Sequence, residues 1–258
     1  DRLEFSGPAI QIAEDLVTVT GAGCGLFTAT ADVLCTQHGE DLSRSELVWL
    51  DRNGDRLGRL GDVASYFSLS VSPDGRRVAA PVTNDTTGTH DLWIYDVERN
   101  LRSRVTFHDA EDMAPAWSPD SREVYFSSNR GGSFAVYRLT PGESAEPELI
   151  AADEGSLMTS SVAPDGSRLL LVREDTDTGS DLMVVELGAG GQPEVFRATR
   201  YNEEHPSFSP DGRWVAYSSD ESGQSEVYVT TSSPNGRHWL VSGDGGIWPR
   251  WIAGTGEL

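Results

Sequence analysis

The sequence predicts an all-β fold, a β-propeller built from four-stranded blades, and three observations predict it. A short turn motif recurs at a nearly constant spacing, strand-like segments recur with it, and no segment has the 3.6-residue periodicity of an amphipathic helix. A period of about 45 residues that contains four short strands is typical of propeller blades. An all-β sandwich is the main alternative, but it would not require similar turns at one spacing.

A turn motif of Ser or Ala, Pro, Asp and a small residue supplies the period. Its prolines are 46, 45 and 46 residues apart. Proline presets the backbone dihedral of a turn, aspartate accepts hydrogen bonds from the backbone that follows, and glycine tolerates a positive φ. Each copy is therefore predicted to be a hairpin turn. The four copies occupy residues 72–75, 118–121, 163–166 and 209–212.

Strand-like segments accompany every turn. One apolar segment precedes the turn, a second follows it, and a third and a more polar fourth complete the repeat. The third segments begin 45, 44, 46 and 45 residues apart, mostly with an acidic residue. Because this acidic residue recurs with the blade, we expect it to have a structural role. The third segments begin at Glu46, Asp91, Ala135, Asp181 and Glu226.

The two ends of the chain predict a ring closed by a shared blade. Residues 7–13 have the pattern of an outer strand with no strands before it, and the last residues resemble an inner strand followed by a turn. We therefore expect one domain over residues 1–258, a six-bladed propeller with five complete repeats and an incomplete or shared last blade. The expected parts are an outer closing strand (1–20), five blades (21–62, 63–108, 109–153, 154–200 and 201–246) and the inner strand of the last blade (247–258).

The composition is strongly acidic. The chain has 41 acidic and 20 basic residues and a formal net charge of -21. Nucleic acid is an unfavourable partner because phosphate binding needs a basic surface, whereas an acidic disc attracts a basic protein. No run of 18 apolar residues occurs, and the chain begins with neither Met nor a signal-type apolar segment. We expect a soluble chain without direct membrane insertion, processed or excised from a longer one.

Two cysteines, Cys24 and Cys35, flank a short predicted hairpin. A turn centred between Ala29 and Thr30 would place them directly opposite each other, within reach of a disulfide. A turn centred one residue later would leave them diagonal, near the limit of disulfide geometry. The sequence leaves both alternatives open, a disulfide and two buried thiols.

The segment at 208–223, Phe-Ser-Pro-Asp-Gly-Arg-Trp-Val-Ala-Tyr-Ser-Ser-Asp-Glu-Ser-Gly, resembles the blades of TolB-like, WD40-like six-bladed propellers. The resemblance extends over nearly the whole chain. It is closest to the propellers that follow a membrane segment in certain bacterial serine/threonine kinases, on residues 47–58, 117–120 and 208–217. The family continues for two more strands where this chain stops at Leu258. The resemblance implies a bacterial, extracytoplasmic protein in the periplasm.

Propeller-bearing enzymes supply the catalytic alternatives. Prolyl-oligopeptidase-type peptidases carry a hydrolase domain with a Gly-x-Ser-x-Gly motif, and the nearest string here, residues 223–227, lacks the final Gly. Residues 51–55, from Asp51 to Asp55, resemble half of a calcium loop, but Arg56 stands where the loop needs Gly and the closing Glu is missing. The acidic segment 174–181 is a second stretch that could hold a calcium ion. We expect both to be turns or solvated connections, and we expect no catalytic residue and no cofactor.

A metal-dependent lyase would need histidines and carboxylates that converge at the channel. In blade register, His108 and His205 lie in loops on the same face, next to acidic residues. We favour solvated acidic loops and no metal site. The acidic residues are Asp109, Glu111, Asp112, Glu203 and Glu204.

The remaining prediction is a rigid disc whose loops bind a protein or peptide without catalysis. Aromatic and arginine side chains are favoured anchors at such faces, whereas Trp117, Phe208 and Trp251 are expected to pack between blades. This predicts an extracytoplasmic sensor module or a membrane-extrinsic subunit of a larger assembly; the alternative is the propeller domain of a peptidase or a lyase. The candidate anchors are Tyr66, His108, Tyr201, His205, Trp248 and Arg250.

Overall fold

The computed structural model describes residues 18–19, 24–25, 27–29, 34–39, 45–51, 53–175, 179–188, 190–252 and 258. Within these ranges the protein consists of strands and loops with no helix, so none of it is a helix long and apolar enough to span a membrane. The predicted all-β class is confirmed. The prediction of six blades is not, because much of the sixth would come from residues 1–17 and 253–257, which lie outside the described part.

Five antiparallel sheets of four strands make up most of the described chain. The first two sheets contain β3 (Phe27–Ala29), β4 (Leu34–Gly39), β5 (Ser45–Leu50) and β6 (Arg56–Ala64), then β7 (Ser70–Val71), β8 (Arg77–Thr83), β9 (His90–Asp96) and β10 (Leu101–Arg104). The next two contain β11 (Asp112–Trp117), β12 (Val124–Ser128), β13 (Ala135–Leu139) and β14 (Glu148–Ala151), then β15 (Ser156–Val162), β16 (Arg168–Asp175), β17 (Gly179–Glu186) and β18 (Glu194–Arg197). The fifth contains β19 (Glu203–Phe208), β20 (Trp214–Ser219), β21 (Glu226–Thr231) and β22 (His238–Leu240), and β1 (Thr18–Val19) pairs with β2 (Cys24–Gly25) in a two-stranded sheet.

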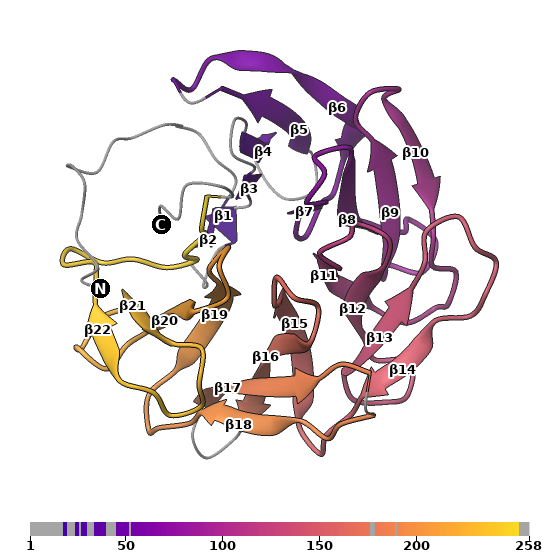
Figure 1. The fold of residues 1–258 in the computed structure, drawn as a ribbon. Coiled ribbons are helices and arrows are strands. Elements are labelled where there is room, and N and C mark those ends of the chain that lie inside the picture. The colour runs from indigo at the N-terminus through magenta and orange to yellow at the C-terminus, as the bar shows by residue number, and fades with distance from the viewer. Residues whose placement is uncertain are drawn as a thin grey trace.

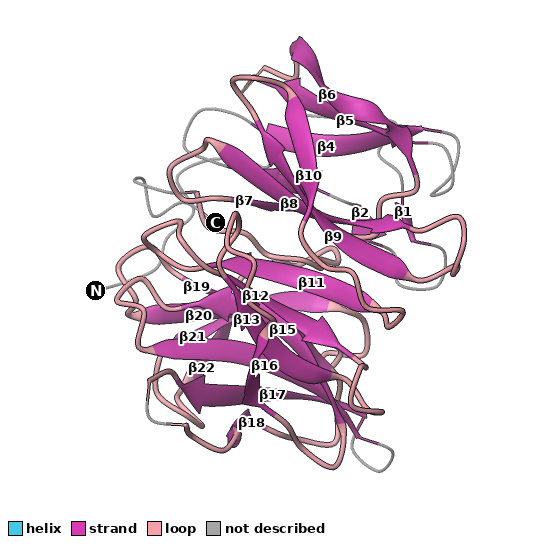
Figure 2. Cartoon of the chain, turned by 90° about the vertical axis from the view of Figure 1, so that its right-hand side faces the viewer, coloured by secondary structure: helices cyan, strands magenta, loops and turns pink. Residues whose placement is uncertain are grey.

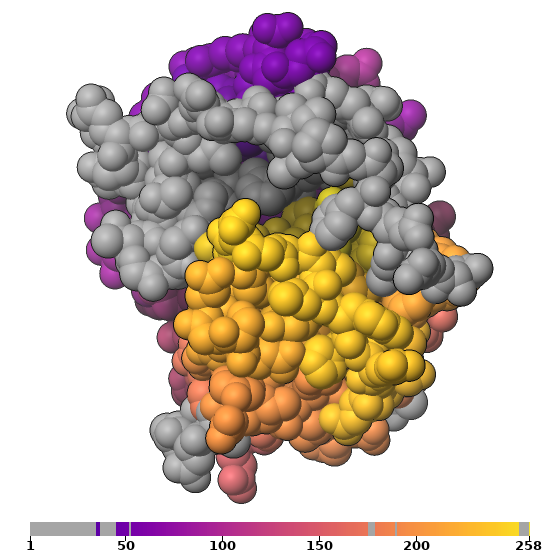
Figure 3. Space-filling model, turned by 90° about the vertical axis from the view of Figure 1, so that its left-hand side faces the viewer, coloured from indigo at the N-terminus to yellow at the C-terminus, as the bar shows by residue number. Residues whose placement is uncertain are grey.

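The four-stranded sheets follow one another around a ring in chain order (Figure 1). In each sheet the first strand lies nearest the centre and the fourth lies at the rim. Seen from the side, successive sheets stack face to face (Figure 2). On the side shown in Figure 3, residues of the fifth sheet and the segment after it, orange to yellow, form a continuous surface.

The hydrophobic core lies between neighbouring blades, because each large cluster of buried residues takes its members from two adjacent sheets. One cluster joins Leu92 and Ile94 of β9 to Trp117, Val124 and Phe126 of the next blade. The other three join the first blade to the second, the third to the fourth, and the fourth to the fifth. Burial of apolar area between sheets therefore holds the ring together.

The predicted hairpin turns are present, and their hydrogen bonds show why the motif repeats. In the first copy, Ser72 Oγ accepts a bond from the backbone N–H of Arg77 (2.9 Å) and donates to Asp74 Oδ1 (2.6 Å). The same serine–aspartate bond occurs at residues 118–120 (2.7 Å) and 209–211 (2.6 Å). In the copy that lacks Gly, Ser121 adopts a positive φ of 62°, and its Oγ accepts a bond from the N–H of Asp74 in the preceding blade (3.1 Å).

The acidic residues that begin the third strands are structural, as expected. Asp91 of β9 is buried and pairs with Arg104 of β10 at 2.8 Å. Asp181 of β17 is buried and pairs with Arg173 of β16 at 2.9 Å. Because each ion pair joins adjacent strands, it fixes the blade and leaves these carboxylates unavailable to a ligand.

Cys35 carries a free, buried thiol, so the disulfide alternative is wrong for this cysteine. The ladder places Thr28 opposite Cys35 and Ala29 opposite Leu34, so the turn falls later than either predicted centre. The backbone of Cys24 pairs instead with Val19, and its side chain lies outside the described part. Burial raises the pKa of the Cys35 thiol to about 12, which makes it unreactive at neutral pH.

The C-terminal segment begins another repeat, although residues 247–252 form no strand. Trp251 Nε1 donates a hydrogen bond to the carbonyl of Ser207 in β19 (3.0 Å). Trp117 Nε1 makes the matching bond to Ser70 of the blade before it (3.0 Å). Trp251 thus occupies, after the fifth blade, the place that Trp117 occupies after the second.

Candidate functional site

One residue in each repeat, four positions before the turn, contributes to a single pocket at the centre of the ring. The corresponding residue after the fifth blade is Trp248, which lies three positions before Trp251 just as Ala114 lies three positions before Trp117. We call this pocket, which has a volume of about 320 Å³, the central pocket. The five equivalent residues that line it are Ser68, Ala114, Thr159, His205 and Trp248.

Three of these five residues have an unusual backbone. Ala114, His205 and Trp248 have φ values of 50°, 55° and 59°, and each precedes a proline. The pairing register shifts at the first two, which is the mark of a β-bulge. A bulge bends a strand and redirects a side chain, so these positions turn away from the regular alternation of the inner strand.

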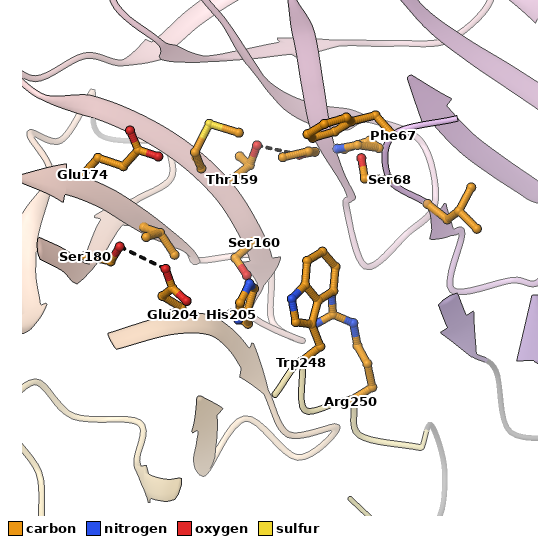
Figure 4. Close-up of a pocket in the computed structure, with 15 residues that line it drawn as sticks. Phe67, Ser68, Thr159, Ser160, Glu174, Ser180, Glu204, His205, Trp248 and Arg250 are labelled. Atoms are coloured by element: carbon orange, nitrogen blue, oxygen red, sulfur yellow. Dashed lines mark hydrogen bonds between the residues drawn. The ribbon is translucent and has the colours of Figure 1, made fainter. Parts of the chain in front are cut away.

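The central pocket combines an apolar lining with a few polar groups (Figure 4). Phe67 and Leu69 come from the segment before β7, Met158 from β15 and Val172 from β16. Polar groups come from the ends of several blades. They are Ser68, Thr159, Ser160, Glu174, Ser180, Glu204, His205, Trp248 and Arg250.

His205 and Trp248 stack against each other, with ring centroids 4.5 Å apart and an angle of 32° between the planes. His205 Nδ1 and Trp248 Nε1 are buried, and neither has a hydrogen-bond partner among the residues described. Burial, and then the charge of Arg250, lower the pKa of His205 to about 3. The imidazole is therefore neutral at physiological pH.

Arg250 provides a positive charge next to this stack. Its guanidinium lies 5.5 Å from the centre of the Trp248 ring, and its Nη1 donates to the carbonyl of Pro249 (3.1 Å). Burial lowers the pKa of Arg250 to about 10, so the side chain still carries its charge at neutral pH. No ion pair involves this arginine within the described ranges.

Carboxylates occupy the other side of the central pocket. Glu204 Oε1 accepts a hydrogen bond from Ser180 Oγ (3.1 Å), and Glu174 lies at the end of β16. Figure 4 shows Glu174 and Glu204 on one side of His205, with Trp248 and Arg250 on the other. The pocket is therefore polarised, with hydrogen-bond donors and a cation on one wall and two carboxylates on the opposite wall.

Three predicted anchors line the central pocket, namely His205, Trp248 and Arg250. The prediction for Tyr66 is wrong, because this residue is 1% exposed, donates its hydroxyl to the carbonyl of Asp62 (2.6 Å) and packs edge-on against Tyr95. A phenol buried between two blades cannot contact a partner.

The other two predicted anchors lie away from the pocket lining. His108 is exposed, and its Nδ1 accepts a bond from the N–H of Ala110 (3.1 Å) within its own loop. Tyr201 is half-buried, and its hydroxyl accepts a bond from Arg200 Nη2 (2.7 Å). Their contacts are therefore local to their loops.

The residues considered as metal ligands do not form a cluster. No group of three or more His, Cys, Asp or Glu side chains within the described ranges could hold a metal ion. Glu111 Oε2 instead contacts His90 Nδ1 at 2.7 Å, and Asp112 pairs with Arg130 at 2.9 Å. Asp51, in the half calcium loop, uses Oδ1 to accept bonds from the N–H groups of Asn53 (2.8 Å) and Asp55 (2.9 Å), which is a hairpin turn.

A second hollow, of about 660 Å³, lies between the first two blades, and its polar groups are engaged with one another. Asp91 accepts bonds from Arg104 (2.8 Å) and Asn84 (3.0 Å), while Arg102 stacks over Trp93 at 4.9 Å. The central pocket is the better candidate for ligand binding, because His205 Nδ1 and Trp248 Nε1 in its lining have no hydrogen-bond partner among the described residues.

Five four-stranded sheets that follow one another around a ring, with a polarised pocket at its centre, form a β-propeller with a candidate binding site on its axis. A family model for the TolB beta propeller domain matches residues 63–251. The chain belongs to this family.

Individual relatives match the chain at low identity. The chain is 24% identical over 214 residues to "Uncharacterized peptidase YuxL" of Bacillus subtilis (65% of this chain, 32% of that protein). It is 28% identical over 152 residues to "Tol-Pal system protein TolB" of Helicobacter pylori (57% of this chain, 35% of that protein). It therefore spans about a third of the length of these two relatives.

A solved structure supports the fold. The putative TolB from Agrobacterium tumefaciens superposes with a TM-score of 0.74 at 16% identity, covering 90% of this chain and 86% of that one. At this identity the likeness concerns the fold and not the ligand.

Proposed function

We propose that this propeller is a non-catalytic binding module that captures a protein or peptide partner at the central pocket. The observation that carries the proposal is the set of polar groups described above. Two buried nitrogen atoms, on His205 and Trp248, have no hydrogen-bond partner among the described residues, and the charge of Arg250 lines the same pocket. Because an unsatisfied buried polar group costs about 1–3 kcal/mol, such groups are typical of a site that is completed by a ligand.

The family and the charge favour a protein partner. The relative from Helicobacter pylori is named as a Tol-Pal system protein. The net charge of -21 steers a basic partner toward the disc and repels nucleic acid. We place the chain outside the cytoplasm, in the periplasm, as a sensor module or as a membrane-extrinsic subunit of a larger assembly. Its likeness to the propellers of bacterial kinases stays a prediction.

A second candidate function is the propeller domain of a peptidase. The observation in its favour is the similarity to the Bacillus subtilis relative, which is named as a peptidase and of which this chain covers 32%. The full reading frame separates the two. A hydrolase domain following the propeller would favour the peptidase, and a kinase with a membrane segment would favour the sensor.

A capture experiment from native membranes under mild conditions tests the binding module. The bait proteins are the wild type, Arg250→Ala and a matched control, Arg122→Ala. Arg122 is suitable because its side chain is 81% exposed and lies at a hairpin turn, outside the central pocket. We expect the same partner with the wild type and the control, and a strong loss with Arg250→Ala. Equal recovery by all three proteins would place binding elsewhere.

A further inference from the structure

The polarity of the central pocket also specifies the chemistry of its ligand, and this step rests on the proposed function. The pocket is large enough for one side chain or for the end of a peptide chain. Pockets for small ligands range from about 300 to 1,000 Å³, and this one, of about 320 Å³, lies at the lower limit. A folded partner can therefore place only one or two residues in it.

The donor wall suits a carboxylate. An arginine guanidinium binds a carboxylate through parallel hydrogen bonds, and the indole N–H of Trp248 has no other partner within the described ranges. His205 is neutral and adds no positive charge. A wall with one cation, on a disc with a net charge of -21, matches a single negative charge better than a phosphate dianion.

The opposite wall suits a cation. Neither Glu174 nor Glu204 forms an ion pair with any residue that the structure describes. Ser180 already donates to Glu204 (3.1 Å), which orients the carboxylate without neutralising it. An ammonium or guanidinium group would gain a charge-assisted hydrogen bond here.

The apolar residues of the pocket lining suit an aliphatic stem. Phe67, Met158 and Val172 line the pocket together with the charged groups. Lysine and arginine bury the methylene groups of their side chains along apolar surface while the charged head contacts polar groups. A residue with a carboxylate at one end and a cation at the end of a methylene stem matches all three parts of the pocket.

We propose that the central pocket binds the C-terminal lysine or arginine of a peptide or protein, with the terminal carboxylate at Arg250 and Trp248 and the side-chain cation at Glu174 and Glu204. The free amino acid carries the same two charged groups. A peptide end is favoured because the pocket is open, so that a preceding residue can leave through its mouth.

Calorimetric titration with small synthetic probes tests the proposal on the purified chain. The probes are the tetrapeptide Gly-Gly-Ala-Lys, the same peptide with a C-terminal amide, Gly-Gly-Ala-norleucine, and free lysine. We expect saturable binding of the tetrapeptide. The amide and the norleucine peptide should each bind about tenfold more weakly or worse, because each loses one charge-assisted contact. Free lysine should also bind more weakly than the tetrapeptide.

Variants test which wall of the central pocket binds the carboxylate of the ligand and which binds its side-chain cation. With Arg250→Ala, the acid and the amide should bind equally, and with Glu204→Gln the preference for lysine over norleucine should shrink. Arg122→Ala should behave as the wild type does. Circular dichroism verifies that each variant is folded, and the comparison of probes on the wild type does not depend on any variant.

Three outcomes would overturn the proposal. They are no binding of the tetrapeptide, equal binding of acid and amide by the wild type, and equal binding of free lysine and the tetrapeptide. Failure here is distinguishable from failure of the proposed function. If the membrane capture still depends on Arg250 while the tetrapeptide does not bind, the binding module stands and the ligand chemistry is wrong.

Discussion

The two ends of the inner strands differ in a way that separates scaffold from site. At the turn end, Ser72, Ser118 and Ser209 are the same residue, make the same bond to an aspartate and recur with the blade. Four residues earlier, at the pocket end, the corresponding residues are Ser68, Ala114, Thr159, His205 and Trp248, all different from one another. Repetition therefore marks what builds the ring, and its interruption marks what a ligand would contact.

Hydrogen bonding shows the same difference. The turn serines use their hydroxyl groups both as donor and as acceptor. At the pocket end, Ser68 Oγ, His205 Nδ1 and Trp248 Nε1 are buried without a partner among the residues described. A scaffold gains stability from satisfied polar groups, whereas a binding site keeps some of its groups for the ligand.

The prediction with the largest expected effect replaces one tryptophan at each end of the inner strands by alanine. Trp117→Ala removes a buried side chain that packs between two blades and donates to Ser70, so it should destabilise the protein by about 3–5 kcal/mol. Trp248→Ala should cost only about 1 kcal/mol, because this residue is half-buried and its indole N–H has no partner within the described ranges. Urea unfolding measures both.

Binding of the tetrapeptide should show the reverse order. Trp248→Ala should no longer bind the tetrapeptide. The molecules of Trp117→Ala that remain folded should still bind it. If both variants lost stability equally, the distinction between the two ends would be wrong.

The pH dependence of stability tests the pocket end through His205. Its folded pKa, about 3, is depressed below the usual value of about 6.5, so the unfolded chain binds the proton more readily. The stability that depends on the neutral imidazole is complete above pH 6.5 and decreases as the pH falls below it, by up to about 2 kcal/mol at pH 5. His205→Asn should flatten this part of the curve, because asparagine does not titrate and tolerates the positive φ at this position.

Urea unfolding between pH 7 and pH 5 measures the effect. His108→Asn is the matched control, since that histidine is exposed and lies outside the central pocket. A wild-type protein whose stability does not change over this range would contradict a buried, neutral His205.

Serine-to-alanine substitutions compare the two ends at one residue type. Ser72→Ala removes an acceptor from the N–H of Arg77 and a donor from Asp74 within a buried turn, so it should cost about 1–2 kcal/mol. Ser68→Ala removes a hydroxyl that has no described partner, so its effect on stability should stay within about 0.5 kcal/mol. A larger loss with Ser68→Ala than with Ser72→Ala would reverse the proposed roles.

The sequence predicts the fold well because the turns repeat, and each turn fixes its strands by local chemistry. It predicts part of the candidate site for the same reason: blade register places His205, Trp248 and Arg250 on the face where the inner strands begin. Tyr66 is assigned wrongly because its burial depends on Val82 and Tyr95, which belong to the next sheet and are not visible in a local pattern.

The sequence does not predict that Glu174 and Glu204 form one wall of the pocket, for a related reason. Glu174 lies in an acidic segment that is typical of a solvated connection, and only the curvature of the ring brings it to the side of Glu204. The signal that could have found the site is the break in the repeat itself. The position four residues before each turn changes identity, while the turn that follows it does not.

The smallest expected effect concerns a single turn and distinguishes the two ends by pH range. Bonds from Ser209, from the backbone of Arg213 and from its side chain lower the pKa of Asp211 to about 2. A depressed carboxyl pKa contributes stability above its unfolded value of about 3.9, and that stability is lost as the pH falls toward 2. Because this turn is exposed, Asp211→Asn should cost less than about 1 kcal/mol at pH 7. The cost should vanish below pH 2, where the wild-type carboxyl is protonated too. Acid unfolding of the wild type and Asp211→Asn should thus show the effect of the turn end between about pH 4 and pH 2, whereas the effect of His205 begins near pH 6.5 and continues to about pH 3. A cost of Asp211→Asn that changed above pH 5 would show that the two ends are not independent.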